Sequence, residues 1–79
     1  AMTRLAFEEA RTKVKISLEA VRVNAKMTQK EWAKILGTTN AAVSRWEKGT
    51  EEPTLPQVRK MSELSGIPMD FIFVPDTSN

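Results

Sequence analysis

The sequence contains no cysteine, no histidine and no tyrosine, and only three glycines in 79 residues. The absence of cysteine excludes disulfides, and without cysteine and histidine the usual ligands of a structural zinc ion are missing. A small chain that lacks these supports relies on helix packing, which suits the reducing cytoplasm. No apolar run approaches the roughly 18–20 residues that cross a bilayer, and the start does not resemble a signal peptide. We therefore expect one small cytoplasmic domain.

Residue types that catalyse reactions are also scarce. Besides histidine and cysteine, the chain lacks a glycine-rich phosphate loop and a pair of carboxylates placed for acid–base chemistry. We expect no enzymatic activity, no metal and no other cofactor.

Charge is distributed unevenly along the chain. The segment 11–48 contains nine basic and three acidic residues, whereas the segment 49–79 contains two basic and five acidic residues. A basic half of this kind is a candidate surface for a polyanion. Solvated surface charges without a partner would give the same pattern, so charge alone leaves both interpretations open.

A helix signal precedes Gly37. Thr28 and Glu31 have the spacing of a capping box, in which each side chain binds a backbone N–H of the other residue. The helix is expected to end at Leu36, because Gly37 tolerates the positive φ of a helix C-terminus. The side chains expected to be buried on this helix are Trp32, Ile35 and Leu36.

A second helix signal follows Gly37 directly. Thr38 and Thr39 supply the N-cap of a helix over Asn40–Lys48, and Gly49 ends it. Val43 and Trp46 lie on its apolar stripe, so we interpret Trp46, like Trp32, as a core residue rather than a base-stacking platform. Two helices thus meet across a turn of three or four residues.

Further helices are expected on both sides of this pair. A helix capped by Ser17 precedes it, and a helix capped by Thr54, with Pro56 in its first turn, follows it and ends at Gly66. A short fifth helix is expected from Pro68. The residues expected to face inward on the two longer flanking helices are Leu18, Val21, Ala25, Leu55, Val58, Met61 and Leu64.

The predicted fold class is all-α, with five helices in one domain over residues 17–74 and an N-terminal extension over residues 1–16. Within the extension, residues 4–11 suit a helix, while the alternation of Val14, Ile16 and Leu18 suits an edge strand. Ala1 before Met2 suggests the remnant of an expression tag. Residues 75–79 are expected to form a flexible tail.

A resemblance to a known family rests on the stretch MTQKEWAKILGTTNAAVSRWEKGTEEPT. It is similar to the Cro/repressor-type (XRE-like) helix-turn-helix family in its initial Thr-Gln pair, Ala33, Gly37, the Ser-Arg-Trp-Glu stretch, Gly49 and Pro53. The following LPQVRKMSELSGIPMDFI resembles the last two helices of that family. The resemblance implies a repressor-type DNA-binding domain, and a phage-like transcriptional regulator associated with the bacterial nucleoid.

The outward positions near the start of the 40–48 helix are Asn40, Ala41, Ser44 and Arg45, which we assign to base edges. Asparagine pairs with adenine, arginine with guanine, and the alanine methyl contacts thymine. The family often carries longer polar residues at the positions of Ala41 and Ala42. This departure leaves most of the discrimination to Asn40 and Arg45.

Other residues are expected to bind phosphate or to support the helix pair. Gln29, Thr39 and Lys48 lie at helix ends, where they are placed to bind phosphates. The small Ala33 lets the two helices approach, and a larger residue there is expected to splay them. The resemblance also implies a salt bridge between Arg22 and Glu47.

The expected partner is double-stranded DNA, bound by a homodimer at a pseudo-palindromic operator. An alternative is an antitoxin or another protein-interaction module with the same fold, which would dock a partner chain through the apolar segment Phe71, Ile72 and Phe73. Lys13 and Lys15 suit either a DNA contact or a solubilising edge.

Overall fold

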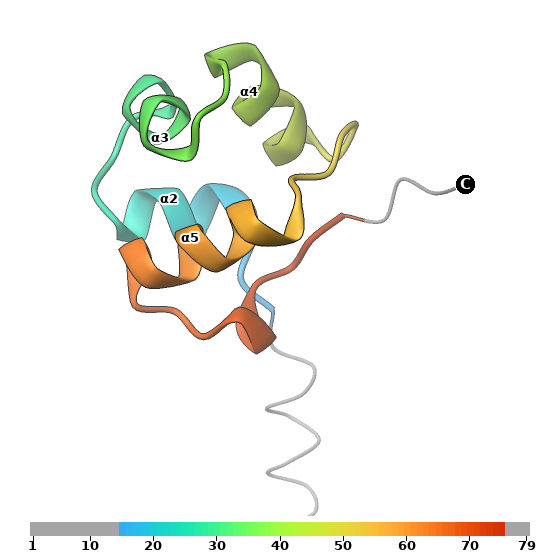
Figure 1. The fold of residues 1–79 in the computed structure, drawn as a ribbon. Coiled ribbons are helices and arrows are strands. Elements are labelled where there is room, and N and C mark those ends of the chain that lie inside the picture. The colour runs from blue at the N-terminus through green and yellow to red at the C-terminus, as the bar shows by residue number, and fades with distance from the viewer. Residues whose placement is uncertain (1–14, 76–79) are drawn as a thin grey trace, which may run out of the picture.

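The computed structural model describes residues 15–75, which form four α-helices and one turn of 3₁₀-helix (Figure 1). The helices α2 and α5 lie side by side, α3 and α4 pack against each other above them, and η1 lies at the opposite end (Figure 1). This arrangement confirms the all-α class for the described residues. The elements are α2 (Leu18–Asn24), α3 (Gln29–Leu36), α4 (Asn40–Lys48), α5 (Leu55–Ser65) and η1 (Met69–Phe71).

The predicted N-terminal extension lies almost entirely outside the described residues, as does the helix considered for residues 4–11. Of the predicted tail, Pro75 alone is described. Ile16 forms a parallel bridge with Ile72, in which the N–H of Ile16 donates to the Phe71 carbonyl at 2.7 Å and the N–H of Phe73 donates to the Ile16 carbonyl at 2.8 Å. Of the three residues assigned to an edge strand, Val14 lies outside the described residues, Ile16 forms this isolated bridge, and Leu18 is already helical.

Each α-helix begins at the side-chain cap expected from the sequence. The caps are Ser17, Thr28, Thr39 and Thr54, and each accepts a hydrogen bond from a backbone N–H in the first turn of its helix. The reciprocal Thr28–Glu31 box is present, with 2.9 Å from the Thr28 nitrogen to Glu31 Oε1 and 3.2 Å from the Glu31 nitrogen to Thr28 Oγ1. A second box, between Thr54 and Gln57, was not predicted. These local signals define where the helices start.

A single apolar core joins the four helices. Both tryptophans belong to it, with Trp32 1% and Trp46 4% exposed, so their interpretation as core residues is correct. Val21 of α2, Val43 of α4 and Met61 of α5 are fully buried beside them. The rest of the core consists of Leu18, Ala33, Leu36, Ala42, Val58 and Ile72.

Two residues expected in the core are exposed instead. On the surface of α3, Ala33 and Ile35 lie on opposite sides of Trp32. The side with Ala33 faces the interior, so Ile35 is 43% exposed. Leu55 is 61% exposed because it occupies the first position of α5, where it borders a surface hollow of about 410 Å³. Apolar spacing predicted both helices correctly but misjudged which residues at the margins of the stripe are covered.

The predicted fifth helix is one 3₁₀ turn of three residues. Pro68 precedes it, and the chain after it is extended, with Ile72 at φ −89° and ψ 124°. The extended stretch pairs with Ile16 and places the Ile72 side chain in the core, 5% exposed. The prediction that Ile72 belongs to an exposed docking segment is therefore wrong. Its neighbour Phe73 is 51% exposed.

Acid is expected to weaken the start of α3 through Glu31. The hydrogen bond from the Thr28 backbone N–H, and secondarily its hydroxyl, lowers the pKa of Glu31 below the usual value of 4.5. A carboxylate whose pKa is lower in the folded state stabilises the fold above its unfolded pKa, and this contribution is lost as the pH falls through the folded pKa. The Glu31→Gln variant is expected to keep the box, as Gln57 does in α5, and to lose less stability below pH 4.5 than the native chain.

This expectation is checked by urea unfolding of both proteins at a series of pH values from neutral down to about pH 3. Parallel pH profiles for the free energy of unfolding would show that the Glu31 carboxylate contributes nothing to the acid sensitivity.

Candidate nucleic-acid interface

The turn between α3 and α4 is fixed by backbone geometry. Gly37 adopts φ +70°, a conformation that suits glycine, and the N–H of Thr38 donates to the Ala33 carbonyl at 2.9 Å. The hydroxyl of Thr39 then accepts the N–H of Ala42 at 3.0 Å and starts α4. Ala33 of α3 is buried, 4% exposed, and its role at the contact between α3 and α4 stays a prediction.

Helix α4 has a buried side and an open side. Ala42, Val43 and Trp46 are buried in the core. Asn40, Ala41 and Arg45 are exposed, and Ser44 is half-buried. The structure therefore brings the predicted base-reading residues together on the side of α4 that points away from the core.

The three residues expected at phosphates differ in their surroundings. Lys48 is exposed at the last position of α4, and Thr39 is exposed although its hydroxyl already caps the helix. Gln29 is half-buried, and its Nε2 donates to Glu47 Oε1 at 3.0 Å. The contact between Gln29 and Glu47 was not anticipated. The phosphate roles of all three residues stay predictions.

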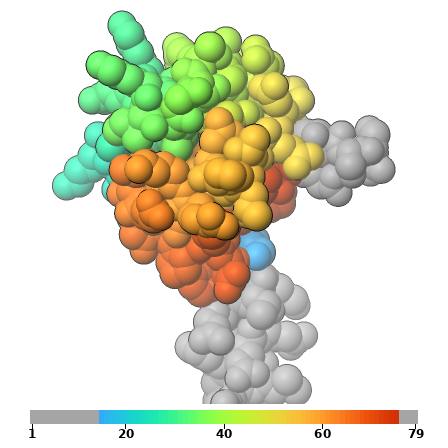
Figure 2. Space-filling view, viewed as in Figure 1, coloured from blue at the N-terminus to red at the C-terminus, as the bar shows by residue number. Residues whose placement is uncertain are grey.

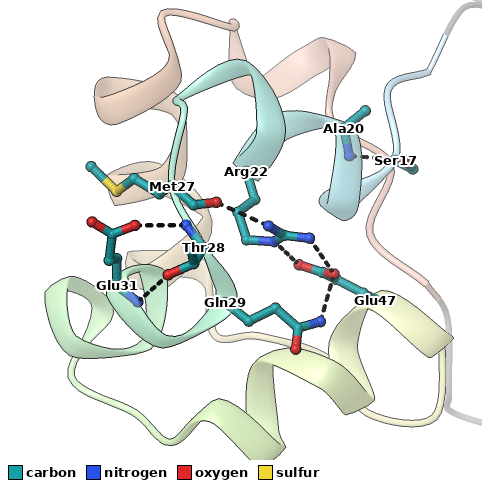
Figure 3. Close-up of polar contacts among 8 residues, drawn as sticks. All are labelled: Ser17, Ala20, Arg22, Met27, Thr28, Gln29, Glu31 and Glu47. Carbon is teal, nitrogen blue, oxygen red and sulfur yellow. Dashed lines mark hydrogen bonds and ion pairs between the residues drawn. The ribbon is translucent and has the colours of Figure 1, made fainter.

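A polar network joins α2, α3 and α4 beneath this surface (Figure 3). The guanidinium of Arg22 points from α2 toward Glu47 of α4, with Nε 2.7 Å from Oε2 and Nη2 3.2 Å from Oε1. Arg22 Nη1 donates to the Met27 carbonyl at 2.9 Å. This ion pair is the one implied by the family resemblance, and Gln29 adds α3 to it.

The Arg22–Glu47 pair is largely shielded from solvent, with the side chains 14% and 7% exposed. The hydrogen bond to Glu47 raises the pKa of Arg22 above its ordinary value, although burial opposes the shift. Arg22 therefore carries its positive charge at neutral pH. Because its charge lies against the Glu47 carboxylate, Glu47 adds little negative potential to the open side of α4.

The exposed charges of α3 and α4 are mostly positive. Four basic side chains are exposed on these helices, compared with the single exposed carboxylate of Glu31. Figure 2 shows the atoms of α3 and α4 covering one end of the molecule, with α5 below them. The basic residues are Lys30, Lys34, Arg45 and Lys48.

Arg45 makes an ion pair that the sequence analysis missed, with its Nε 3.0 Å from Oε2 of Glu51. The only signal in the sequence is the acidic pair Glu51–Glu52 after Gly49, which does not reveal the pairing. Of the two lysines considered for a DNA contact, Lys13 lies outside the described residues, and Lys15 donates to the carbonyl of Asp70 within η1 at 2.7 Å. This contact places Lys15 near the end of the domain opposite α3 and α4 (Figure 1).

Residues 15–75 contain neither a membrane-spanning helix nor a group of side chains that could bind a metal ion. No helix there is long and apolar enough to cross a membrane. Within the same residues, no group of three or more acidic, histidine or cysteine side chains is placed to hold a metal ion.

An exposed helix held across a short glycine turn by a second helix defines the helix-turn-helix class. Residues 18–72 match the model of the helix-turn-helix family HTH_3, which is of the Cro type, and the chain belongs to this family. Comparisons with curated proteins and with solved structures gave no match. Membership implies DNA binding and a role in transcriptional regulation, and the family's members are typically regulators without enzymatic activity.

Proposed function

We propose that the protein is a sequence-specific regulator of transcription, of the phage-repressor type, that inserts α4 into the major groove of double-stranded DNA. The observation that carries this proposal is the two-sided character of α4, whose buried side anchors it while Asn40, Ala41 and Arg45 stay exposed. The major groove is roughly 12 Å wide and admits one helix. The exposed basic residues of α3 and α4 support approach to a polyanion.

Each exposed residue of α4 has a role in this proposal. Asn40 pairs with adenine, Arg45 with guanine, and the Ala41 methyl contacts thymine, while the half-buried Ser44 accepts or donates one hydrogen bond at a base edge. Lys48 binds a backbone phosphate and so fixes the register without reading sequence.

Binding to DNA is proposed to occur as a homodimer at a pseudo-palindromic operator. One copy of α4 contributes few base contacts, because Ala41 replaces the longer side chain common in the family and Ala42, where a longer residue was also expected, is buried in the core. Two copies related by a two-fold axis would place their α4 helices in successive major grooves, about 34 Å apart. Occupancy of the operator would then block access of the polymerase to a promoter.

The alternative of a protein-interaction module has less support. Of its three proposed docking residues, Ile72 lies in the core and Phe71 is half-buried, which leaves Phe73 as the exposed member. Single exposed apolar residues are ordinary on protein surfaces and do not make a docking site.

The proposal is tested by selecting bound sequences from a pool of random duplexes. We expect enrichment of two inverted half-sites whose centres are about 10 base pairs apart. The matched control is Arg59→Ala, which removes an exposed arginine of α5 and is expected to select the same sequence. A bound pool with no preferred sequence would contradict specific recognition, and a single half-site would contradict the dimer.

A further inference from the structure

Arg45, the arginine assigned to guanine, forms an ion pair with Glu51 of the same chain. Its Nε lies 3.0 Å from Glu51 Oε2, and the two side chains are 51% and 44% exposed. An ion pair this exposed contributes little to stability, because solvent screens both charges. The pair therefore bears on the orientation of the Arg45 side chain more than on the stability of the fold.

The loop that carries Glu51 is tied to Arg45 by its backbone. Gly49 ends α4 at φ +82°, which turns the chain back along the helix. The N–H of Thr50 donates to the Arg45 carbonyl at 3.0 Å, and the Thr50 hydroxyl donates to the same oxygen at 3.3 Å. Pro53 is buried and anchors the far end of the loop. The backbone next to Glu51 is thus bound to Arg45, which keeps the Glu51 carboxylate close to the Arg45 side chain.

Because Glu51 pairs with Nε of Arg45, the N–H donors on the other two guanidinium nitrogens stay available to bind a base. An arginine side chain has five N–H donors, one on Nε and two on each terminal nitrogen. Within residues 15–75, Glu51 is the one acceptor paired with this guanidinium, and it uses Nε. The donors on Nη1 and Nη2 remain for the two acceptors, O6 and N7, that guanine presents in the major groove.

We propose that Glu51 is a positioning residue that sets the specificity of Arg45. Its carboxylate orients the guanidinium so that Nη1 and Nη2 lead into the groove, and it competes with phosphates for the Arg45 charge. This inference rests on the proposed function, because it requires Arg45 to read a base. Removal of Glu51 frees the guanidinium to bind phosphates, which strengthens binding to any sequence while weakening discrimination.

The test compares affinities for the selected duplex and for a scrambled duplex of equal length. Glu51→Ala is expected to lower the ratio of the two affinities by about 3- to 5-fold, because an exposed ion pair is weak and orients the guanidinium only in part. Glu51→Gln is expected to lower it less, because the amide oxygen still accepts from Nε. Glu63→Ala, at an exposed glutamate of α5, serves as the matched control and is expected to leave the ratio unchanged.

A double-mutant cycle separates this inference from the proposed function. In an Arg45→Ala background, Glu51→Ala is expected to have no effect on the ratio, since Glu51 acts through Arg45. If Arg45→Ala lowers the ratio but Glu51→Ala does not, the role of Glu51 is refuted and base reading by Arg45 stands. Equal effects of Glu51→Gln and Glu51→Ala would reduce the role to charge alone and refute positioning. If Arg45→Ala itself leaves the ratio unchanged, base reading by Arg45 fails and this inference fails with it.

Discussion

Replacement of Glu47 by alanine is expected to lower the free energy of unfolding by about 3 kcal/mol, because it leaves a largely buried guanidinium without its carboxylate. Arg22 Nε and Nη2 and Gln29 Nε2 would all lose their acceptor. The stability of a domain this small is itself only about 5 kcal/mol, so a measurable unfolded fraction is expected on mild warming. Chemical denaturation followed by tryptophan fluorescence measures the effect, since Trp32 and Trp46 are both buried.

The chain supplies a matched control for this loss. Glu51→Ala also removes a carboxylate from an arginine, but the Arg45–Glu51 pair is exposed and is expected to contribute less than about 1 kcal/mol. The double replacement Arg22→Met with Glu47→Leu is expected to recover part of the loss, because no unpaired charge stays buried. Equal destabilisation by Glu47→Ala and Glu51→Ala would show that burial of the first pair has no energetic consequence.

The ends of the helices could be predicted from sequence because they depend on local chemistry. A threonine three residues before a glutamate marks the start of α3, and glycines directly after Leu36 and Lys48 mark the ends of α3 and α4. These signals need no knowledge of the rest of the chain. The apolar spacing of Val43 and Trp46 predicted the inward side of α4, and therefore also its outward side.

Features that depend on distant residues could not be predicted in the same way. Ile35 was misplaced because the sequence does not reveal which side of Trp32 the neighbouring helix covers. Lys26, in the turn after α2, adopts φ +60°. Because this position holds no glycine, the sequence gives no sign of the turn. The bridge between Ile16 and Ile72 joins the two ends of the described chain, and its partners are 56 positions apart in sequence, as their residue numbers show.

The proposed interaction of α4 with DNA involves two kinds of contact, whose loss is expected to have different consequences. Arg45→Ala is expected to weaken binding to the selected duplex by about 10- to 100-fold, since one good bidentate pair contributes ~1–3 kcal/mol of discrimination. Its effect on a scrambled duplex is expected to be smaller, because only the attraction of one charge is lost there. Lys48→Ala is expected to weaken both complexes by a similar factor and to reduce the salt dependence of binding by about one phosphate contact.

Base reading by the open side of α4 can be distinguished from nonspecific attraction to DNA by one set of affinities. The affinities of the native protein, Arg45→Ala, Lys48→Ala and the α5 control Arg59→Ala are measured on the selected and scrambled duplexes at one salt concentration. Among these variants, we expect Arg45→Ala alone to lower the preference for the selected duplex, with Arg59→Ala close to the native protein. Losses of equal size on both duplexes for Arg45→Ala and Lys48→Ala would contradict base reading by α4.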